Sequence, residues 1–165
     1  MSEYKGRTQL LCAIAVSLWS AVAAGGQATG AGALSAPLRA HLQGERFDIV
    51  TSIRGLPLGV RNTLETLFGS GGLDIAEPGA EFQMTKGAVD PKLPTRRLAA
   101  AWCSTDHCFV YYERGGSAHT WHAALFHWTP AGTKLEGGGV APAGLATTDA
   151  VRNLILTGAT KAGSW

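Results

Sequence analysis

The chain has no large excess of charge of either sign. Lysine and arginine contribute 14 of the 165 residues and aspartate and glutamate contribute 12, so the formal net charge is +2. Proteins that bind nucleic acid or anionic lipid through bulk charge usually carry a marked basic excess. The composition therefore gives no support for a nucleic-acid partner or for attachment to an anionic membrane.

Long apolar segments are also lacking beyond the amino-terminal region. A helix that spans a bilayer needs about 20 mainly apolar residues, and no segment after residue 24 provides them. Internal repeats are absent from the sequence, and the remaining length suits one domain. We therefore expect no membrane span and a single domain over residues 41–165.

Cysteine is scarce, and motifs for catalysis are missing. Of the three cysteines, Cys12 lies in the amino-terminal region, which leaves Cys103 and Cys108. Their spacing is not the C-x-x-C of thiol oxidoreductases. A nucleophile elbow of the G-x-S-x-G type is absent as well. We expect a protein that is not an enzyme and that needs neither a metal nor another cofactor.

The amino terminus predicts export. Lys5 and Arg7 precede an apolar run over residues 10–24, and small residues close that run. This order is typical of a cleavable secretory signal, here over residues 1–24. Residues 25–40 are rich in Gly, Ala and Ser and predict a flexible leader. A periplasmic or secreted location would permit a disulfide between the two remaining cysteines.

Hydrophobic periodicity predicts an α+β fold. Residues 57–69 suit a helix, because Pro57 favours the first turn, Gly69 favours the end, and apolar residues recur at helical spacing. A second helix is predicted from Thr147 to Gly158. Strand-like runs predict an antiparallel meander over residues 98–136, with the helices packed on one face. The runs comprise residues 98–103, 108–113, 118–128 and 133–136, after an earlier strand at 47–53.

A further local feature follows from strand geometry. Arg96 and Arg97 are adjacent, so in a strand they point to opposite faces. We expect two solvated charges rather than one anion site.

The centre of the chain predicts a disulfide-closed hairpin. Cys103 and Cys108 flank a four-residue loop, which places them opposite each other at a spacing that a disulfide accepts. A bridge there would hold the loop side chains outward, and a rigid loop loses less entropy on binding. The candidate partner-binding residues are therefore Ser104, Thr105, Asp106 and His107.

This C-x4-C loop resembles the signature loop of the periplasmic inhibitor of vertebrate lysozyme family. The order after the loop is also similar to that family: a strand, a turn, and a second strand that ends near Leu125-Phe126. The late Leu156-Thr157-Gly158 is similar to it as well. The resemblance implies a signal peptide, a small α+β fold and a loop that enters the active-site cleft of a C-type lysozyme. In this chain Asp106 precedes His107, which is the reverse of the family order.

Two other interpretations draw on further residues or give the loop residues a different role. A metal site could draw on His119, His122 and His127, although strand alternation separates His122 from the other two. A small exported hydrolase would need a nucleophile, a base and an orienting acid. The sequence offers Ser104 or Ser117 as nucleophile, His107, His122 or His127 as base, and Asp106 or Glu113 as acid.

The prediction from sequence is thus an exported single-domain protein that acts by binding a protein partner. The resemblance implies a C-type lysozyme as that partner. The alternatives are the small hydrolase, the metal-binding protein and an envelope interaction protein with another partner. The sequence leaves the oligomeric state open.

Overall fold

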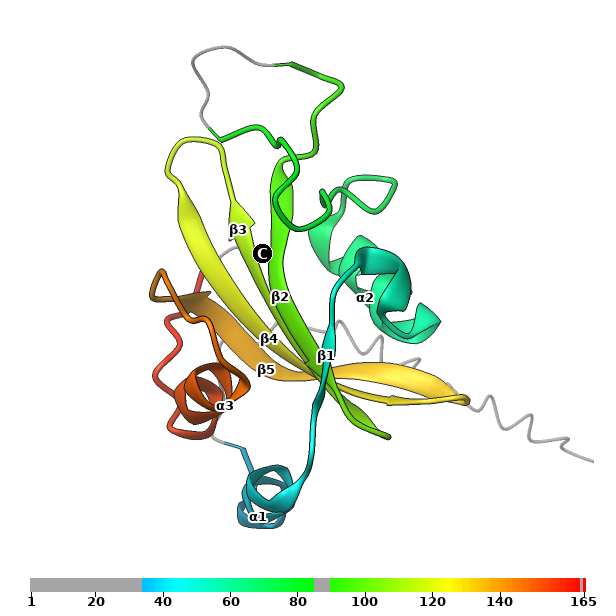
Figure 1. Cartoon of the computed structure of the whole chain (residues 1–165), viewed down its shortest axis with the longest axis vertical. Helices are drawn as coiled ribbons and strands as arrows, with labels where there is room; N and C mark the ends of the chain where they lie inside the picture. The colour runs from blue at the N-terminus through cyan, green and yellow to red at the C-terminus, as the bar shows by residue number, and fades with distance from the viewer. Residues whose placement is uncertain (1–33, 85–89, 164) are drawn as a thin grey trace, which may run out of the picture.

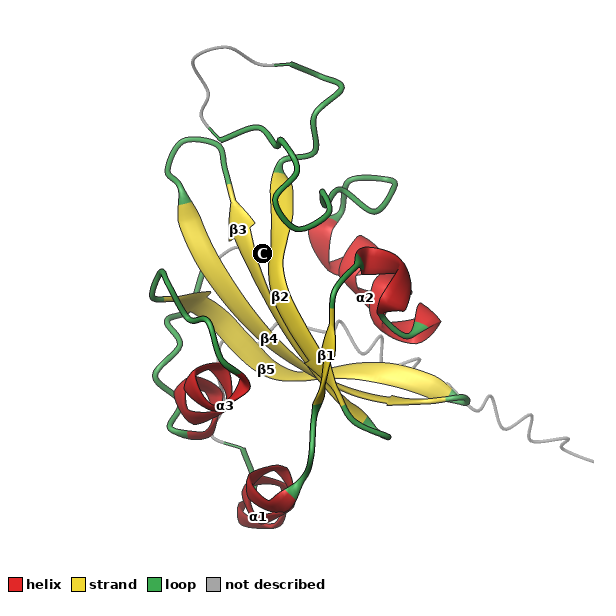
Figure 2. Cartoon of the chain, in the orientation of Figure 1, coloured by secondary structure: helices red, strands yellow, loops and turns green. Residues whose placement is uncertain are grey.

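The computed structural model describes residues 34–84, 90–163 and 165. The predicted signal over residues 1–24 lies outside the described residues, as does most of the predicted leader. In the described part, the strands form one sheet, and helices lie on either side of it (Figures 1 and 2). The elements are α1 (Ala36–Gly44), β1 (Asp48–Val50), a 3-10 turn (Ile53–Gly55), α2 (Leu58–Phe68), β2 (Arg96–Cys103), β3 (His107–Arg114), β4 (Thr120–Thr129), β5 (Gly132–Ala141) and α3 (Thr148–Leu156).

The sheet has five antiparallel strands in the order β1-β2-β3-β4-β5. Spatial order equals chain order, so the predicted meander and the α+β class are confirmed. The meander runs from residue 96 to residue 141, which is longer than the predicted 98–136. Strand β1 extends it by pairing with the outer side of β2.

Helices cover both faces of this sheet. Along a strand, successive side chains point to opposite faces, so Val110 and Tyr112 face one way and Phe109 and Tyr111 the other. The first face packs against α2, and the second packs against α1 and α3 (Figure 1). The prediction had placed the helices on one face; the structure divides them between two.

Helix α2 forms as its sequence predicts. Its buried residues Val60, Leu64 and Phe68 recur every four positions along one side. Gly69 ends the helix with φ of 64°, a left-handed conformation that glycine adopts without steric cost. Helix α3 likewise begins after Thr147, whose hydroxyl accepts a hydrogen bond from the Ala150 N–H.

Helix α1 begins within the segment that the sequence assigned to the flexible leader. Residues 36–40 form its first half, after Ser35, whose hydroxyl oxygen accepts from the Leu38 N–H. Pro37 suits a first turn because it lacks an N–H that would need a partner. Leu42 is fully buried and joins the helix to the α3 side of the sheet. The Gly-, Ala- and Ser-rich composition of residues 25–40 gave no indication of this short amphipathic helix.

The two arginines predicted to be solvated are ion-paired instead. Arg96 is buried, and its Nη1 lies 2.7 Å from a carboxylate oxygen of Asp74 while Nη2 donates to the Trp165 carbonyl oxygen. Arg97 donates through two nitrogens to one carboxylate oxygen of Glu113. They do lie on opposite faces, as predicted. The acidic partners come from distant parts of the sequence, which local pattern cannot reveal.

The glycine run at 137–139 lies inside β5, beyond the predicted end of the meander at residue 136. Gly138 and Gly139 have φ of 141° and 155°, a region that other residues rarely adopt. The Gly138 backbone also packs directly against the carbonyl of Ala123 in β4. Glycine is therefore required there because a neighbouring strand occupies the space of a side chain.

We predict that Gly138→Ala destabilises the fold by at least about 2 kcal/mol, through backbone strain and overlap with β4. Gly137→Ala is the matched control, because its added carbon would meet only the Leu34 side chain at 3.6 Å, an ordinary contact distance. Chemical denaturation of both variants measures the difference. Equal free energies of unfolding for the two variants would contradict this explanation.

Candidate functional site

The turn between β2 and β3 is closed by a disulfide. Cys103 and Cys108 are bonded, with Cα atoms 4.1 Å apart. The Ser104 N–H donates to the His107 carbonyl oxygen, so the cysteines occupy the next, non-hydrogen-bonded pair, where side chains approach most closely. The Trp128 N–H in turn donates to the Asp106 carbonyl oxygen. The turn is thus fixed to both β2 and β4.

The four predicted loop residues are not all displayed. Thr105 is exposed, and Ser104 and Asp106 are partly exposed. The side chain of His107 is only 4% exposed, which corrects the prediction that it points outward. His107 is the first residue of β3, so alternation directs it opposite to Cys108, toward α1. Its ring lies between those of His41 and His127, with centroid separations of 5.2 and 5.0 Å.

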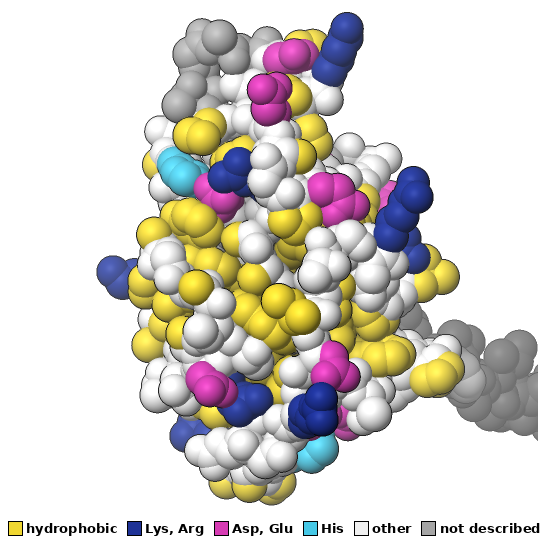
Figure 3. Space-filling model, viewed as in Figure 1, with side chains coloured by type: hydrophobic (Ala, Val, Ile, Leu, Met, Phe, Trp, Pro, Cys, Tyr) yellow, Lys and Arg dark blue, Asp and Glu magenta, His cyan; other side chains and the backbone are white. Residues whose placement is uncertain are grey.

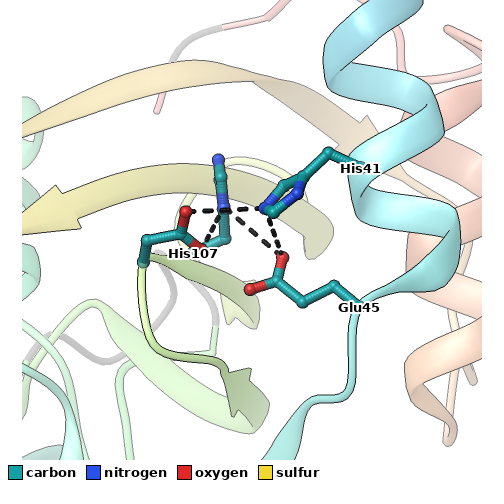
Figure 4. A group of neighbouring side chains, drawn as sticks. His41, Glu45 and His107 are labelled. Atoms are coloured by element: carbon teal, nitrogen blue, oxygen red, sulfur yellow. Dashed lines mark hydrogen bonds and ion pairs between the residues drawn. The ribbon is translucent and has the colours of Figure 1, made fainter.

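His107 belongs to a cluster of imidazoles and carboxylates. The donor atoms of His41, Glu45, Asp106 and His107 all lie within 4.8 Å of one another. His107 Nδ1 lies 2.8 Å from Asp106 Oδ1 and 3.5 Å from Glu45 Oε2. His41 Nε2 lies 3.3 Å from Glu45 Oε2 and 3.4 Å from Asp106 Oδ2. Figure 4 shows the side chains of His41, Glu45 and His107 turned toward a common centre.

The carboxylates of this cluster have perturbed acidity. Burial raises the pKa of Glu45, and the nearby Asp106 carboxylate adds to the effect. For Asp106, burial opposes ionisation, but hydrogen bonds with Glu45 and His107 outweigh it and lower the pKa to about 2. A carboxyl group with a raised pKa and one with a lowered pKa therefore lie side by side in one small site.

Two segments of the backbone position the cluster: the end of α1 and the disulfide-closed turn. His41 and Glu45 are four residues apart at the carboxyl end of α1, a spacing that puts both side chains on one helical face. The Glu45 carbonyl oxygen accepts a hydrogen bond from Arg152 of α3. Asp106 and His107 come from the disulfide-closed turn. Sequence reasoning missed His41 and Glu45, although their i, i+4 spacing at a helix end was a usable signal.

The three histidines around β4 do not converge. His119 Nε2 lies 2.9 Å from Glu113 Oε2, on the carboxylate that also binds Arg97. His122 faces the α2 side and stacks on Tyr112 with ring centroids 5.1 Å apart. His127 lies at the edge of the cluster of His41, Glu45, Asp106 and His107, with its ring centroid 5.0 Å from that of His107. The alternation that separates His122 from the other two is as predicted.

The proposed hydrolase residues are also not arranged as a nucleophile beside a base. The Ser104 hydroxyl accepts from the His107 backbone N–H and donates to the His107 carbonyl oxygen, rather than contacting the ring. Ser117 is exposed in the β3–β4 turn, at the opposite end of β3 from the disulfide. Within residues 34–84 and 90–163, no serine hydroxyl is hydrogen-bonded to the imidazole of a histidine that is in turn paired with a carboxylate, as a catalytic triad would require.

A groove of about 810 Å³ lies on the α2 side beside the disulfide. Its walls include Cys103, Trp128 and the start of α2, where Leu58 is 63% exposed. Among the described residues, Trp128 Nε1 and Thr133 Oγ1 are buried polar atoms without a hydrogen-bond partner. This volume lies in the usual range of ligand-binding pockets, and the lining is mainly apolar.

No family model, curated protein or solved structure matches this chain. Within the described residues, none of the helices has the length and apolar character needed to cross a bilayer. In the view of Figure 3, acidic and basic side chains are interspersed among hydrophobic ones, without a large area of one charge.

We predict that His122 makes the free energy of unfolding decrease as the pH falls. Burial, with contributions from Arg114 and Arg96, lowers its pKa to about 4 from the ordinary 6.5. The unfolded chain therefore binds a proton at a higher pH than the folded chain does. The stabilisation is complete above pH 6.5 and is lost as pH falls toward 4.

For His122 alone, the loss from about pH 7.5 to about pH 5 amounts to roughly 2 kcal/mol. Denaturation curves at several pH values for the wild type and for His122→Gln measure it. The variant keeps a polar group near Thr120 Oγ1, the 3.0 Å partner of His122 Nε2, but cannot titrate. A variant with the same pH dependence as the wild type would refute the assignment.

Proposed function

We propose that this protein acts by binding a protein partner outside the cytoplasm, through the stapled end of its sheet. The stapled end comprises the turn 104–106 and the adjoining groove. One observation carries the proposal: Cys103 belongs both to the disulfide that closes the turn and to the wall of the groove. A rigid polar tip and an apolar recess thus form one continuous surface.

The physical chemistry of this surface suits protein recognition. Binding surfaces combine apolar or aromatic anchors at the centre with a polar rim. Here Leu58 and Trp128 supply apolar area, and Ser104, Thr105 and Asp106 supply polar groups at the edge. The disulfide and the bond from Trp128 N–H fix the turn in advance, which reduces the entropy lost on association.

Export is part of the proposal and rests on two supports. The amino-terminal sequence has the basic, apolar and small-residue order of a secretory signal. The disulfide between Cys103 and Cys108 is of a kind that persists in oxidising compartments.

A C-type lysozyme is the specific partner that we propose, from the resemblance of the C-x4-C loop to the lysozyme-inhibitor family. The buried position of His107 changes how such contact would work. Thr105 and Asp106 are the loop residues available to enter a cleft. The imidazole accessible beside them is that of His41, whose side chain is 48% exposed and lies next to Asp106.

We predict that Thr105→Arg abolishes partner binding without changing the thermal midpoint, because exposed turn residues contribute little to folding. Ser117→Arg is the matched control, since Ser117 is equally an exposed turn residue but lies at the opposite end of β3. The first assay is inhibition of cell-wall lysis by a C-type lysozyme, followed by calorimetric titration.

Inhibition by the wild type and by Ser117→Arg, but not by Thr105→Arg, would support both the surface and the partner. Absence of inhibition at a large molar excess would reject lysozyme as the partner. Unchanged inhibition by Thr105→Arg together with Leu58→Arg would reject the stapled end as the contact surface.

For export, we predict that the protein recovered from the periplasm or medium lacks its first 23 or 24 residues, with cleavage after Ala23 or Ala24. Intact-mass measurement gives the result directly. A product that retains Met1, or that remains in the cytoplasm, would contradict the signal assignment.

A further inference from the structure

We propose that His41, Glu45, Asp106 and His107 form a binding site for one divalent transition-metal ion, with Zn²⁺ as the best fit. The site lies on the α1 side of the sheet, on the other face from the groove of the proposed function. The site shares Asp106 and His41 with the surface of the proposed function, but Zn²⁺ binding is measured without a protein partner, so either proposal can fail without the other.

The donor set is the first argument. Two imidazole nitrogens and two carboxylates lie within 4.8 Å of one another. Imidazole and carboxylate oxygen are ordinary zinc ligands, and four of them complete a tetrahedral site. The nearby cysteines are joined in the disulfide, so sulfur does not take part.

The distances are the second argument. Three contacts in the cluster measure 3.3, 3.4 and 3.5 Å, and they join His41 to Glu45, His41 to Asp106 and His107 to Glu45. Hydrogen bonds from nitrogen to oxygen are shorter, at about 2.7–3.2 Å. Four ligands at about 2.0–2.1 Å from a central ion lie about 3.3–3.4 Å apart at tetrahedral angles. These three pairs of donors are therefore spaced as in a zinc site, whereas His107 Nδ1 and Asp106 Oδ1 lie 2.8 Å apart, at the distance of a hydrogen bond.

The third argument is an unsatisfied oxygen at the centre. The Glu45 side chain is only 10% exposed, and its Oε2 is buried without a hydrogen-bond partner in the described part of the chain. This same oxygen is the atom that both imidazoles approach. Leaving a buried carboxylate oxygen unpaired costs free energy. A cation bound among the four groups would remove that cost.

The support around the cluster is the fourth argument. Metal sites gain affinity when the ligands are held in place before the ion arrives. Asp106 and His107 are held by the disulfide and by pairing with β4, where His127 lies opposite His107. Glu45 is held by the bond between its carbonyl oxygen and Arg152. The side chains of His41 and Asp106 are 48% and 36% exposed, which gives the ion a path from solvent.

A network of ion pairs without metal is the competing explanation. Protonated His41 and His107 could neutralise the two carboxylates. In that case each histidine would donate a short hydrogen bond to a carboxylate, as His119 does to Glu113 at 2.9 Å. Only the His107–Asp106 contact is that short in the cluster. His119 and Glu113 therefore provide an internal standard for an ordinary pair.

The test is calorimetric titration of the full chain with Zn²⁺ after treatment with a chelator. We expect one ion per chain. His41→Gln should weaken binding at least tenfold, because it removes a ligand from a half-exposed position where folding is not at stake. His119→Gln is the matched control, since His119 is also partly exposed and carboxylate-bound but lies outside the cluster.

Two further measurements separate loss of a ligand from loss of fold. Glu45→Gln keeps the size and removes the negative charge, and it should also weaken Zn²⁺ binding at least tenfold. The thermal midpoint of the wild type should rise with Zn²⁺ concentration, because an ion that binds only the folded chain stabilises it. The midpoints of both cluster variants should not respond to Zn²⁺.

The proposal stands if Zn²⁺ binds the wild type and His119→Gln with equal affinity and binds the cluster variants at least tenfold more weakly. It is overturned if the wild type takes up no Zn²⁺ at one-to-one stoichiometry. It is overturned equally if His41→Gln and Glu45→Gln, folded by circular dichroism, bind as the wild type does.

Discussion

Strands β2 and β3 pair from Arg96 opposite Arg114 to Cys103 opposite Cys108, and the sheet extends outward from this hairpin. Its side chains alternate between two hydrophobic cores, one under α2 and the other under α1 and α3. The register therefore decides which face receives each group. Because His107 and Cys108 are consecutive, the disulfide lies toward the groove while the imidazole lies toward α1. The same turn therefore borders the groove on one face of the sheet and contributes His107 to the cluster on the other face.

Local pattern predicted the elements that depend on local chemistry. Helix α2 has its apolar spacing and its glycine stop within one segment, and the cysteine pair needs only a hairpin to bring it together. Partners remote in sequence could not be inferred in this way. Asp74 meets Arg96, and His41 meets Asp106, only through packing of the fold. The alternation of side chains along a strand would have placed His107 on the face opposite to Cys108. The prediction of an outward-pointing loop did not take this alternation into account.

The buried polar groups show where this fold departs from a purely apolar interior. Arg96, Glu113 and His122 are all buried beside the sheet, and the two charged groups meet opposite charges. Such pairs cost free energy when one partner is removed, so they fix the ends of the strands more than they add net stability. Glu45 is the exception, since its Oε2 has no hydrogen-bond partner in the described residues, although two imidazoles lie 3.3 and 3.5 Å from it.

The equality of spatial and chain order has a consequence for how the molecule folds. Each of the hairpins β2–β3, β3–β4 and β4–β5 closes over a short turn, so little chain entropy is lost before its contacts form. Strand β1 differs, because residues 51–95 separate it from its partner β2. We therefore expect the four-stranded meander to assemble first and β1 and α2 to dock onto it afterwards. On that order, the groove between α2 and the β4–β5 hairpin would form late and would open before the meander does.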